Sequence, residues 1–260
     1  MPIVYAHRGG AALRPENTIL AFDHGMALGA DGLEFDVQLS RDGVVVVHHD
    51  RTLERTTSGR GALASHTAAE LAALDACCNF ADASGQHSYR GTGFGVPTLR
   101  EVLHRYPHAQ LIIELKRSGS GLAHAVVDEI RAAHAVDRTA IGSFHLSALR
   151  AVREYGPALR TGAAAIETRW ALYRSWVGWP LGQTRYREFQ VPVRSGPTPI
   201  VTRRFVDHAH RAGVSVKVWT VNTADEIRRL VSYGVDAVIT DRPDVARAVI
   251  PRHSFEGAAE

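Results

Sequence analysis

The sequence is poor in cysteine and in long apolar runs. Its 260 residues include only two cysteines, Cys77 and Cys78, which are neighbours. Adjacent cysteines have poor geometry for a disulfide and are too few for a zinc site, so we expect a reduced, intracellular protein. No segment approaches the roughly 18–20 unbroken apolar residues of a membrane-spanning helix. The first ten residues, MPIVYAHRGG, lack the pattern of a signal peptide. We therefore expect a cytoplasmic protein.

An excess of charge of one sign is also lacking. The 30 basic residues are scattered among 27 acidic ones, and the formal net charge is +3 at pH 7. Proteins that bind nucleic acid usually gather basic residues on one surface, so composition gives little support to nucleic-acid binding. The length suits one large α/β domain or two small ones, with a sizeable core that needs no disulfides.

β-rich runs alternate with segments of helical periodicity almost from end to end, which is typical of a parallel α/β fold. The candidate strands are residues 3–8, 32–39, 111–116, 139–144, 159–164, 188–193, 215–221 and 236–241. The candidate helices are residues 17–29, 98–106, 121–134, 146–155, 202–212, 223–233 and 243–250, with a less regular one within 166–181. Eight βα units predict a TIM (β/α)8 barrel.

One segment departs from this alternation. Residues 40–97 contain a run of four valines, the sequence RTTSGRGAL and a passage rich in Gly, Ser and His. A simple loop of this length is unusual in a compact domain. We therefore predict a single barrel domain over residues 1–250 with a small insertion after the second strand, at approximately 50–97. A short flexible tail is expected over 251–260.

Three carboxylates fall within otherwise apolar strands. Glu34 and Asp36 are two residues apart in GLEFDVQL, so they point to the same face, and Glu114 lies in LIIELK, two residues before Lys116. Taken alone, Glu34 and Asp36 also fit a polar alternation on a half-exposed strand. Together, three ionised carboxylates inside a barrel need a compensating charge. Oxygen ligands without a nearby cysteine favour one divalent ion, Mg²⁺ or Ca²⁺, over zinc.

The first strand ends in AHRGG, which places His7 and Arg8 at the end of the barrel where such enzymes keep their catalytic groups. Alone, His-Arg-Gly is more typical of a surface turn. Beside the three carboxylates, it completes what a phosphodiester reaction requires. These requirements are cations for the phosphoryl oxygens, a metal ion for the developing charge and imidazoles for proton transfer.

In this order, six motifs resemble the glycerophosphodiester phosphodiesterase family over about residues 3–247: HRGG…PENT, GLEFDVQLSRDGVVVVHHDRTLERTTSGRG, PTLREVL, LIIELK, VKVWTVN and GVDAVITDRPD. The resemblance implies a TIM barrel with a small insertion and a metal-dependent hydrolase. It also implies an acid/base pair (His7 and His49), metal ligands (Glu34, Asp36 and Glu114), phosphate-binding residues (Arg8 and Lys116) and Trp219 on the glycerol or leaving-group side.

The reaction implied by the resemblance converts a glycerophosphodiester to sn-glycerol 3-phosphate and an alcohol. The glycerol 2-hydroxyl attacks phosphorus while one histidine removes its proton and the other protonates the leaving alcohol, and water then opens the cyclic phosphate. Two alternatives remain open. One is a phospholipase D-like or lysophospholipase D activity on the same barrel, and the other is a barrel that binds phosphodiesters without catalysis. The alcohol, the preferred metal and the oligomeric state are also open.

The sequence VVVVHHD, residues 44–50, contains two adjacent histidines. A strand's period of two sends His48 and His49 to opposite faces, so both cannot be catalytic. The motif position favours His49. We therefore expect His48 to be a packing or hydrogen-bonding residue on the outer face, with Asp50 at the start of a turn.

For the aromatic cluster, the last aspartates and several of the histidines, we expect structural rather than catalytic roles. The aromatic cluster RWALYRSWVGWP, residues 169–180, is expected to pack in the core along one helix face, with a hydrophobic lip for a lipid-like leaving group as the alternative. Asp241 or Asp244 is expected to cap the last helix. Seven histidines on helical patterns are expected at the surface: His24, His104, His108, His124, His134, His208 and His210.

Overall fold

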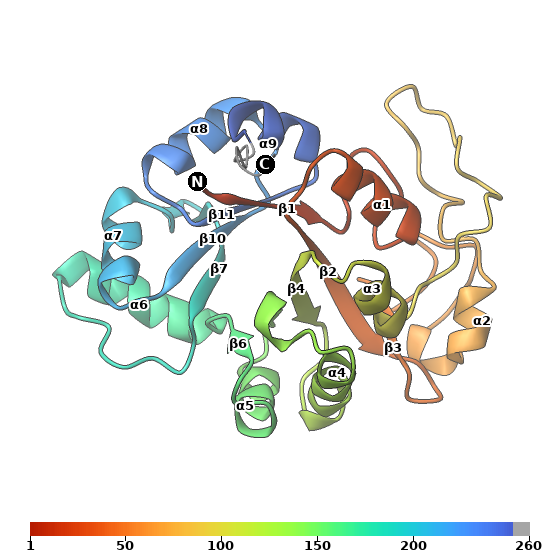
Figure 1. Cartoon of the computed structure of the whole chain (residues 1–260), viewed down its shortest axis with the longest axis horizontal. Helices are drawn as coiled ribbons and strands as arrows, with labels where there is room; N and C mark the ends of the chain where they lie inside the picture. The colour runs from red at the N-terminus through yellow and green to blue at the C-terminus, as the bar shows by residue number, and fades with distance from the viewer. Residues whose placement is uncertain (252–260) are drawn as a thin grey trace, which may run out of the picture.

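The computed structural model describes residues 1–251 and forms a TIM barrel (Figure 1). Except for Pro251, the predicted tail lies outside the described residues. The barrel strands are β1 (Ile3–His7), β2 (Gly32–Leu39), β4 (Gln110–Leu115), β5 (Thr139–Gly142), β6 (Arg160–Thr161), β7 (Glu188–Pro192), β10 (Ser215–Trp219) and β11 (Ala237–Thr240).

These eight strands pair in the order β6-β5-β4-β2-β1-β11-β10-β7, and the paired barrel strands are parallel. The two ends of this order meet at a parallel bridge between Gly162 and Glu188. There, Ala163 N donates to Glu188 O at 2.9 Å. The barrel is thus nearly closed, which confirms the predicted fold class. The largest difference is β6, which is shorter than predicted because the chain turns away to begin the next helix.

Helices follow the strands around the outside of the barrel (Figure 1). They are α1 (Ile19–Ala27), α3 (Leu99–Arg105), α4 (Ser120–Ala132), α5 (Leu146–Tyr155), α6 (Ala165–Val177), α7 (Arg203–Arg211), α8 (Ala224–Ser232) and α9 (Pro243–Val249). Threonine side chains cap the first turns of α1, α3, α7 and α8, which fits the preference of hydroxyl residues for N-caps. Within residues 1–251, no helix has the length and apolar character needed to cross a membrane.

The segment after β2 forms a small unit at the side of the barrel (Figure 1). Strand β3 (Val45–Val47) pairs antiparallel with β2, placing Val47 opposite Val37. The 3-10 helix η1 (Leu63–Ser65) and helix α2 (Ala68–Ala72) follow. They share a separate small core, formed by Val46, Leu53, Leu63, Leu71, Ala76 and Val96. A second short hairpin, β8 (Arg194–Ser195) with β9 (Thr198–Pro199), follows β7.

One of the seven helical histidines is not at the surface. His208 is buried on α7 together with Phe205, Val206 and Ala209, because the helical period brings all four to the face that packs on the barrel. Burial lowers the pKa of His208. The surface prediction was therefore wrong for His208, whereas the other six histidines are half-buried or exposed.

Candidate active site

A cavity of about 610 Å³ opens at the carboxyl ends of the barrel strands. Ile112 and Ile239 form part of its floor, where they belong to the small apolar cluster inside the barrel. Asp36 is only 1% exposed and contacts two of the lining cations, Arg8 and Lys116. The other seven predicted site residues line the cavity directly: His7, Arg8, Glu34, His49, Glu114, Lys116 and Trp219. The structure therefore brings together all eight residues.

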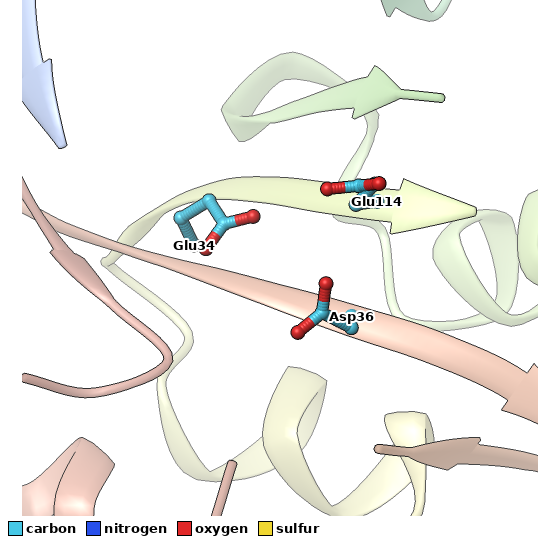
Figure 2. A group of neighbouring side chains, drawn as sticks. All are labelled: Glu34, Asp36 and Glu114. Carbon is cyan, nitrogen blue, oxygen red and sulfur yellow. The ribbon is translucent and has the colours of Figure 1, made fainter. Parts of the chain in front are cut away.

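The three carboxylates lie between β2 and β4. One oxygen of each of Glu34, Asp36 and Glu114 lies within 4.8 Å of the others, and Figure 2 shows the three side chains around a common space. The parallel register pairs Asp36 with Glu114, which brings their side chains to the same height.

Among the described residues, no lysine or arginine forms an ion pair with Glu34, in contrast to Asp36 and Glu114. The Oε2 atom of Glu34 is buried without a hydrogen bond. Burial raises the pKa of Glu34 to about 8. The negative charges of Asp36 and Glu114 also raise it, whereas His7 lowers it. Burial also raises the pKa of Glu114, and Asp36 adds to this effect. A buried, unsatisfied oxygen within a set of hard donors fits a divalent cation.

The stability of the metal-free protein should fall as the pH rises from about 5 to 8. Burial raises the pKa of Glu34 from 4.5 to about 8 in the folded state. Between these two pH values, the folded state keeps the proton on Glu34 whereas the unfolded chain has released it. This proton stabilises the folded state at low pH, and the stabilisation is lost as the pH rises towards about 8. Thermal unfolding in EDTA at several pH values measures the slope, which should be smaller in Glu34→Gln. An identical slope in both proteins would contradict the shift.

His7 ends β1 and is held by a carboxylate from the opposite end of the chain. Its Nδ1 lies 2.6 Å from Asp241 Oδ1, and its Nε2 lies 3.7 Å from Glu34 Oε2. Burial alone lowers the pKa of His7, but Glu34 and Asp241 outweigh this effect, so the pKa is raised. Asn222 Nδ2 donates to the other Asp241 oxygen at 2.8 Å. Asp241 therefore fixes the His7 ring.

The predicted capping role of Asp241 and Asp244 was wrong. The N-cap of α9 is Arg242, which makes no side-chain capping bond, and Asp244 pairs with the Arg242 guanidinium. Although burial raises the pKa of Asp241, the hydrogen bond from His7 lowers it below its usual range. In the sequence, the only sign that Asp241 belongs to the site was its position at the end of the last strand.

Asp241→Asn should reduce turnover without changing the fold. The amide cannot stabilise a protonated His7 ring as a carboxylate does, so the proton transfer predicted for His7 becomes less favourable. We expect the kcat loss to be smaller than in His7→Ala, with no further loss when the two changes are combined, because both residues act through one imidazole. Steady-state kinetics of the two single variants and the double variant test this. Additive losses would show that Asp241 acts independently of His7.

His49 reaches the cavity from the insertion. Its Nδ1 lies 2.6 Å from Asp50 Oδ1, and Asp50 in turn accepts a hydrogen bond from Arg55. His48 is only 4% exposed, and its Nε2 lies 3.2 Å from Thr52 O. The two histidines thus have different surroundings, and the hydrogen bond predicted for His48 is present. Its side chain is buried within the insertion rather than on an outer face.

The backbone that carries His49 is tied to β2 by one side chain. Gln38 Nε2 donates to the carbonyl oxygens of His48 at 3.1 Å and His49 at 3.3 Å. It also donates to Asp50 O at 2.5 Å. Gln38 is itself buried. Together with the β2–β3 pairing, this amide sets the position of His49 relative to the barrel.

Two cations lie beside the carboxylates. Arg8 Nε is 3.2 Å from Asp36 Oδ2, and Lys116 Nζ is 3.4 Å from Asp36 Oδ1 and 3.2 Å from Glu114 Oε1. Asn17, with a left-handed φ of 58°, donates to Asp36 at 3.0 Å. The carboxylates thus hold both cations at the cavity wall.

A second carboxylate links Arg8 to the insertion. Arg8 donates to Glu16 at 2.9 Å, and Arg55 donates to both Glu16 oxygens at 2.7 and 2.8 Å. Although burial opposes it, these arginines lower the pKa of Glu16 to about 2. Arg55 also binds Asp50, the partner of His49. Sequence reasoning did not single out Glu16, Asn17 or Arg55, although they lie in the PENT and RTLERT stretches.

The other side of the cavity is apolar. Its lining includes Phe144, Leu172, Trp176 and Ile200. Trp219 packs edge-on against Phe144, with ring centroids 5.9 Å apart. This wall comes from α6 and from the connections after β5 and β7, whereas the carboxylate cluster lies on β2 and β4.

The core prediction for the aromatic cluster was wrong. Trp170, Trp176 and Trp179 are 60%, 53% and 63% exposed. Small residues such as Ala171 and Ser175 form the buried face of α6 instead. Because Trp176 lines the cavity, the alternative of a hydrophobic lip agrees better with the structure.

Comparison with known proteins agrees with this geometry. The model of the glycerophosphoryl diester phosphodiesterase family matches residues 7–245. A glycerophosphodiester phosphodiesterase from Caldanaerobacter subterraneus subsp. tengcongensis is 31% identical over 250 residues, which cover 93% of this chain and 95% of that protein.

Two solved structures extend the comparison. The glycerophosphoryl diester phosphodiesterase domain of an uncharacterized Mycobacterium tuberculosis protein has a TM-score of 0.84 at 25% identity, covering 95% of this chain and 98% of that one. An Oleispira antarctica phosphodiesterase in complex with the product sn-glycerol-3-phosphate has a TM-score of 0.76 at 27% identity, covering 97% and 98%. The chain therefore belongs to the glycerophosphoryl diester phosphodiesterase family, a family of phosphoric diester hydrolases.

Proposed function

We propose that this protein hydrolyses glycerophosphodiesters to sn-glycerol 3-phosphate and an alcohol, and that residues 1–250 act as one catalytic domain. The observation that carries the proposal is the pair of histidines at one cavity, each with its Nδ1 held by a carboxylate. A barrel that only binds phosphodiesters needs no such pair. The product complex of the Oleispira relative supports the substrate class.

Glu34, Asp36 and Glu114 would hold one hard divalent ion, Mg²⁺ or Ca²⁺. When bound, the ion offsets the negative charge that develops on the phosphoryl oxygens. Arg8 and Lys116 have side chains that line the cavity next to these carboxylates, and they would donate to the phosphoryl oxygens. Trp219 would contact the glycerol or the leaving group on the apolar side.

His7 and His49 would transfer the protons. Because a carboxylate holds Nδ1 of each ring, Nε2 is the atom available to the substrate. One histidine removes the proton from the glycerol 2-hydroxyl as its oxygen attacks phosphorus, and the other protonates the departing alcohol. In the second step, water opens the cyclic phosphate while the two histidines exchange roles.

Lysophospholipase D activity is the second candidate function. The apolar wall that contains Phe144, Leu172 and Trp176 favours it, because an acyl chain on the glycerol could lie there. The polar half of the cavity would serve either substrate with the same groups. The difference between the candidates is therefore one of substrate specificity.

Parallel assays with glycerophosphocholine and a lysophosphatidylcholine separate these functions. We expect metal-supplemented enzyme to release sn-glycerol 3-phosphate from the first. Release of lysophosphatidic acid from the second, without turnover of the first, would replace the leading proposal. Binding of both compounds without turnover of either would indicate a non-catalytic barrel.

A further inference from the structure

Helix α6 has an unusual outer surface. Its residues Thr168, Leu172 and Trp176 line the cavity, so one side of the helix already packs on the barrel. A second apolar group faces solvent: Ile166 (41% exposed), Trp170 (60%), Tyr173 (47%), Val177 (48%) and, just beyond the helix, Trp179 (63%). We call these five residues the aromatic face. Four of them recur at intervals of three or four, so they form one stripe along the helix.

Other outer helices of the barrel do not share this pattern. The exposed residues of α7 include Arg203 and Asp207, and those of α8 include Asp225 and Arg228. Within residues 1–251, six of the nine large exposed hydrophobic side chains fall between positions 166 and 179. An exposed apolar group of this kind marks a surface that contacts another molecule or a membrane.

The charges around the aromatic face are positive. Arg204 donates to the carbonyl oxygens of Ser175 and Trp176, and Arg174 donates to those of Pro180 and Leu181. Within the described part of the chain, neither arginine forms an ion pair with a carboxylate. Their positive charges are therefore uncompensated where they border the apolar side chains.

The carboxylate on this helix does not cancel that charge. Glu167 is already bound by both ends of the Arg153 guanidinium, at 2.8 and 2.9 Å. Arg169, on the same helix, is exposed and lines the cavity. The partner of this surface is thus expected to be both apolar and anionic.

The aromatic face is also continuous with the cavity. Trp176 is 53% exposed and lines the cavity at the same time, and Figure 1 shows α6 beside α7 at the edge of the barrel. A second copy of the chain seated here would cover the cavity mouth at Trp176. Docking on a lipid layer would instead leave the cavity mouth open and place it next to lipid molecules, which can enter the cavity from the surface of the layer.

We propose that the aromatic face docks the protein on an anionic phospholipid surface, with the cavity mouth toward the lipid. Trp and Tyr side chains prefer the headgroup region of a bilayer, and nearby arginines are attracted to anionic headgroups. The proposal goes beyond the hydrolytic function and does not depend on it, because docking is measured without turnover.

Vesicle sedimentation tests the proposal. We expect the protein to bind phosphatidylglycerol vesicles, to bind phosphatidylcholine vesicles less, and to lose affinity as salt screens the arginines. Three of the four tryptophans lie in residues 170–179, so docking should also shift tryptophan emission to shorter wavelength. Trp170→Ser combined with Trp179→Ser should weaken vesicle binding by about tenfold or more.

Tyr155→Ser is the matched control, since Tyr155 is an exposed aromatic residue on α5, away from the aromatic face. It should bind vesicles like the unchanged protein. Without vesicles, all three proteins should hydrolyse glycerophosphocholine equally and unfold at similar temperatures. Equal vesicle binding by the double variant, or no binding of phosphatidylglycerol at low salt, would overturn the proposal. So would a dimer, seen by sedimentation velocity, that the double variant loses.

Discussion

His49→Ala should lower kcat/KM for glycerophosphocholine by about 10²- to 10⁴-fold, the usual contribution of positioned proton transfer. His7→Ala should have an effect of the same order. Each ring lines the cavity and is oriented through Nδ1 by a carboxylate. Alanine removes the proposed proton-transfer group without disturbing the barrel, because neither histidine belongs to an apolar core cluster. Steady-state kinetics with saturating Mg²⁺ or Ca²⁺ measure the loss.

The neighbouring histidine supplies the control. His48 is buried and bonds to Thr52 O rather than lining the cavity. His48→Ala should therefore cost stability, on the order of 1–3 kcal/mol, and leave turnover per folded molecule within a few-fold of the unchanged enzyme. A severe loss of turnover in His48→Ala, with near-normal turnover in folded His49→Ala, would reverse the assignment of the two residues.

Chelation should have the second large effect. We expect EDTA to reduce turnover by about 10³-fold or more, since Lewis-acid stabilisation of phosphoryl charge contributes several kcal/mol. Added Mg²⁺ or Ca²⁺ should restore it. Asp36→Asn should weaken this recovery, because Asp36 contributes a carboxylate to the cluster and also contacts Arg8 and Lys116. Activity titrations against metal concentration give the apparent affinity.

Asp244→Asn is the matched control for the metal experiment. Asp244 pairs with Arg242 at the start of α9 and does not belong to the carboxylate cluster. Its replacement should leave the metal requirement unchanged. Full activity of the unchanged enzyme after exhaustive chelation would show that the three carboxylates serve another purpose.

The barrel and the carboxylate cluster were largely predictable from local periodicity. The alternation of strands and helices sets the fold, and β2 was predicted at its observed bounds, Gly32–Leu39. A period of two within that strand places Glu34 and Asp36 on one face. Parallel pairing then brings Glu114 beside Asp36. Only this last step joins residues that are remote in the sequence, and the barrel architecture supplies it because successive barrel strands pair side by side.

Asp241 was missed because its partner is remote in the sequence. An aspartate shortly before Pro243 is a reasonable helix cap by local rules, yet its hydrogen bond joins residues 234 positions apart. The aromatic cluster was misplaced for a related reason. Spacing predicts which side chains of α6 share a face, but only the packing of the helix shows which face the barrel covers.

The tie between Gln38 and the backbone of residues 48–50 has a consequence for exchanging parts between relatives. The insertion carries His49, one member of the proposed acid/base pair, so it cannot be exchanged independently of the barrel. A chimera that takes residues 44–55 from another protein must also take a compatible β2, including the residue at position 38. The mostly exposed stretch 81–88, beyond the small core, is the part that can be replaced on its own.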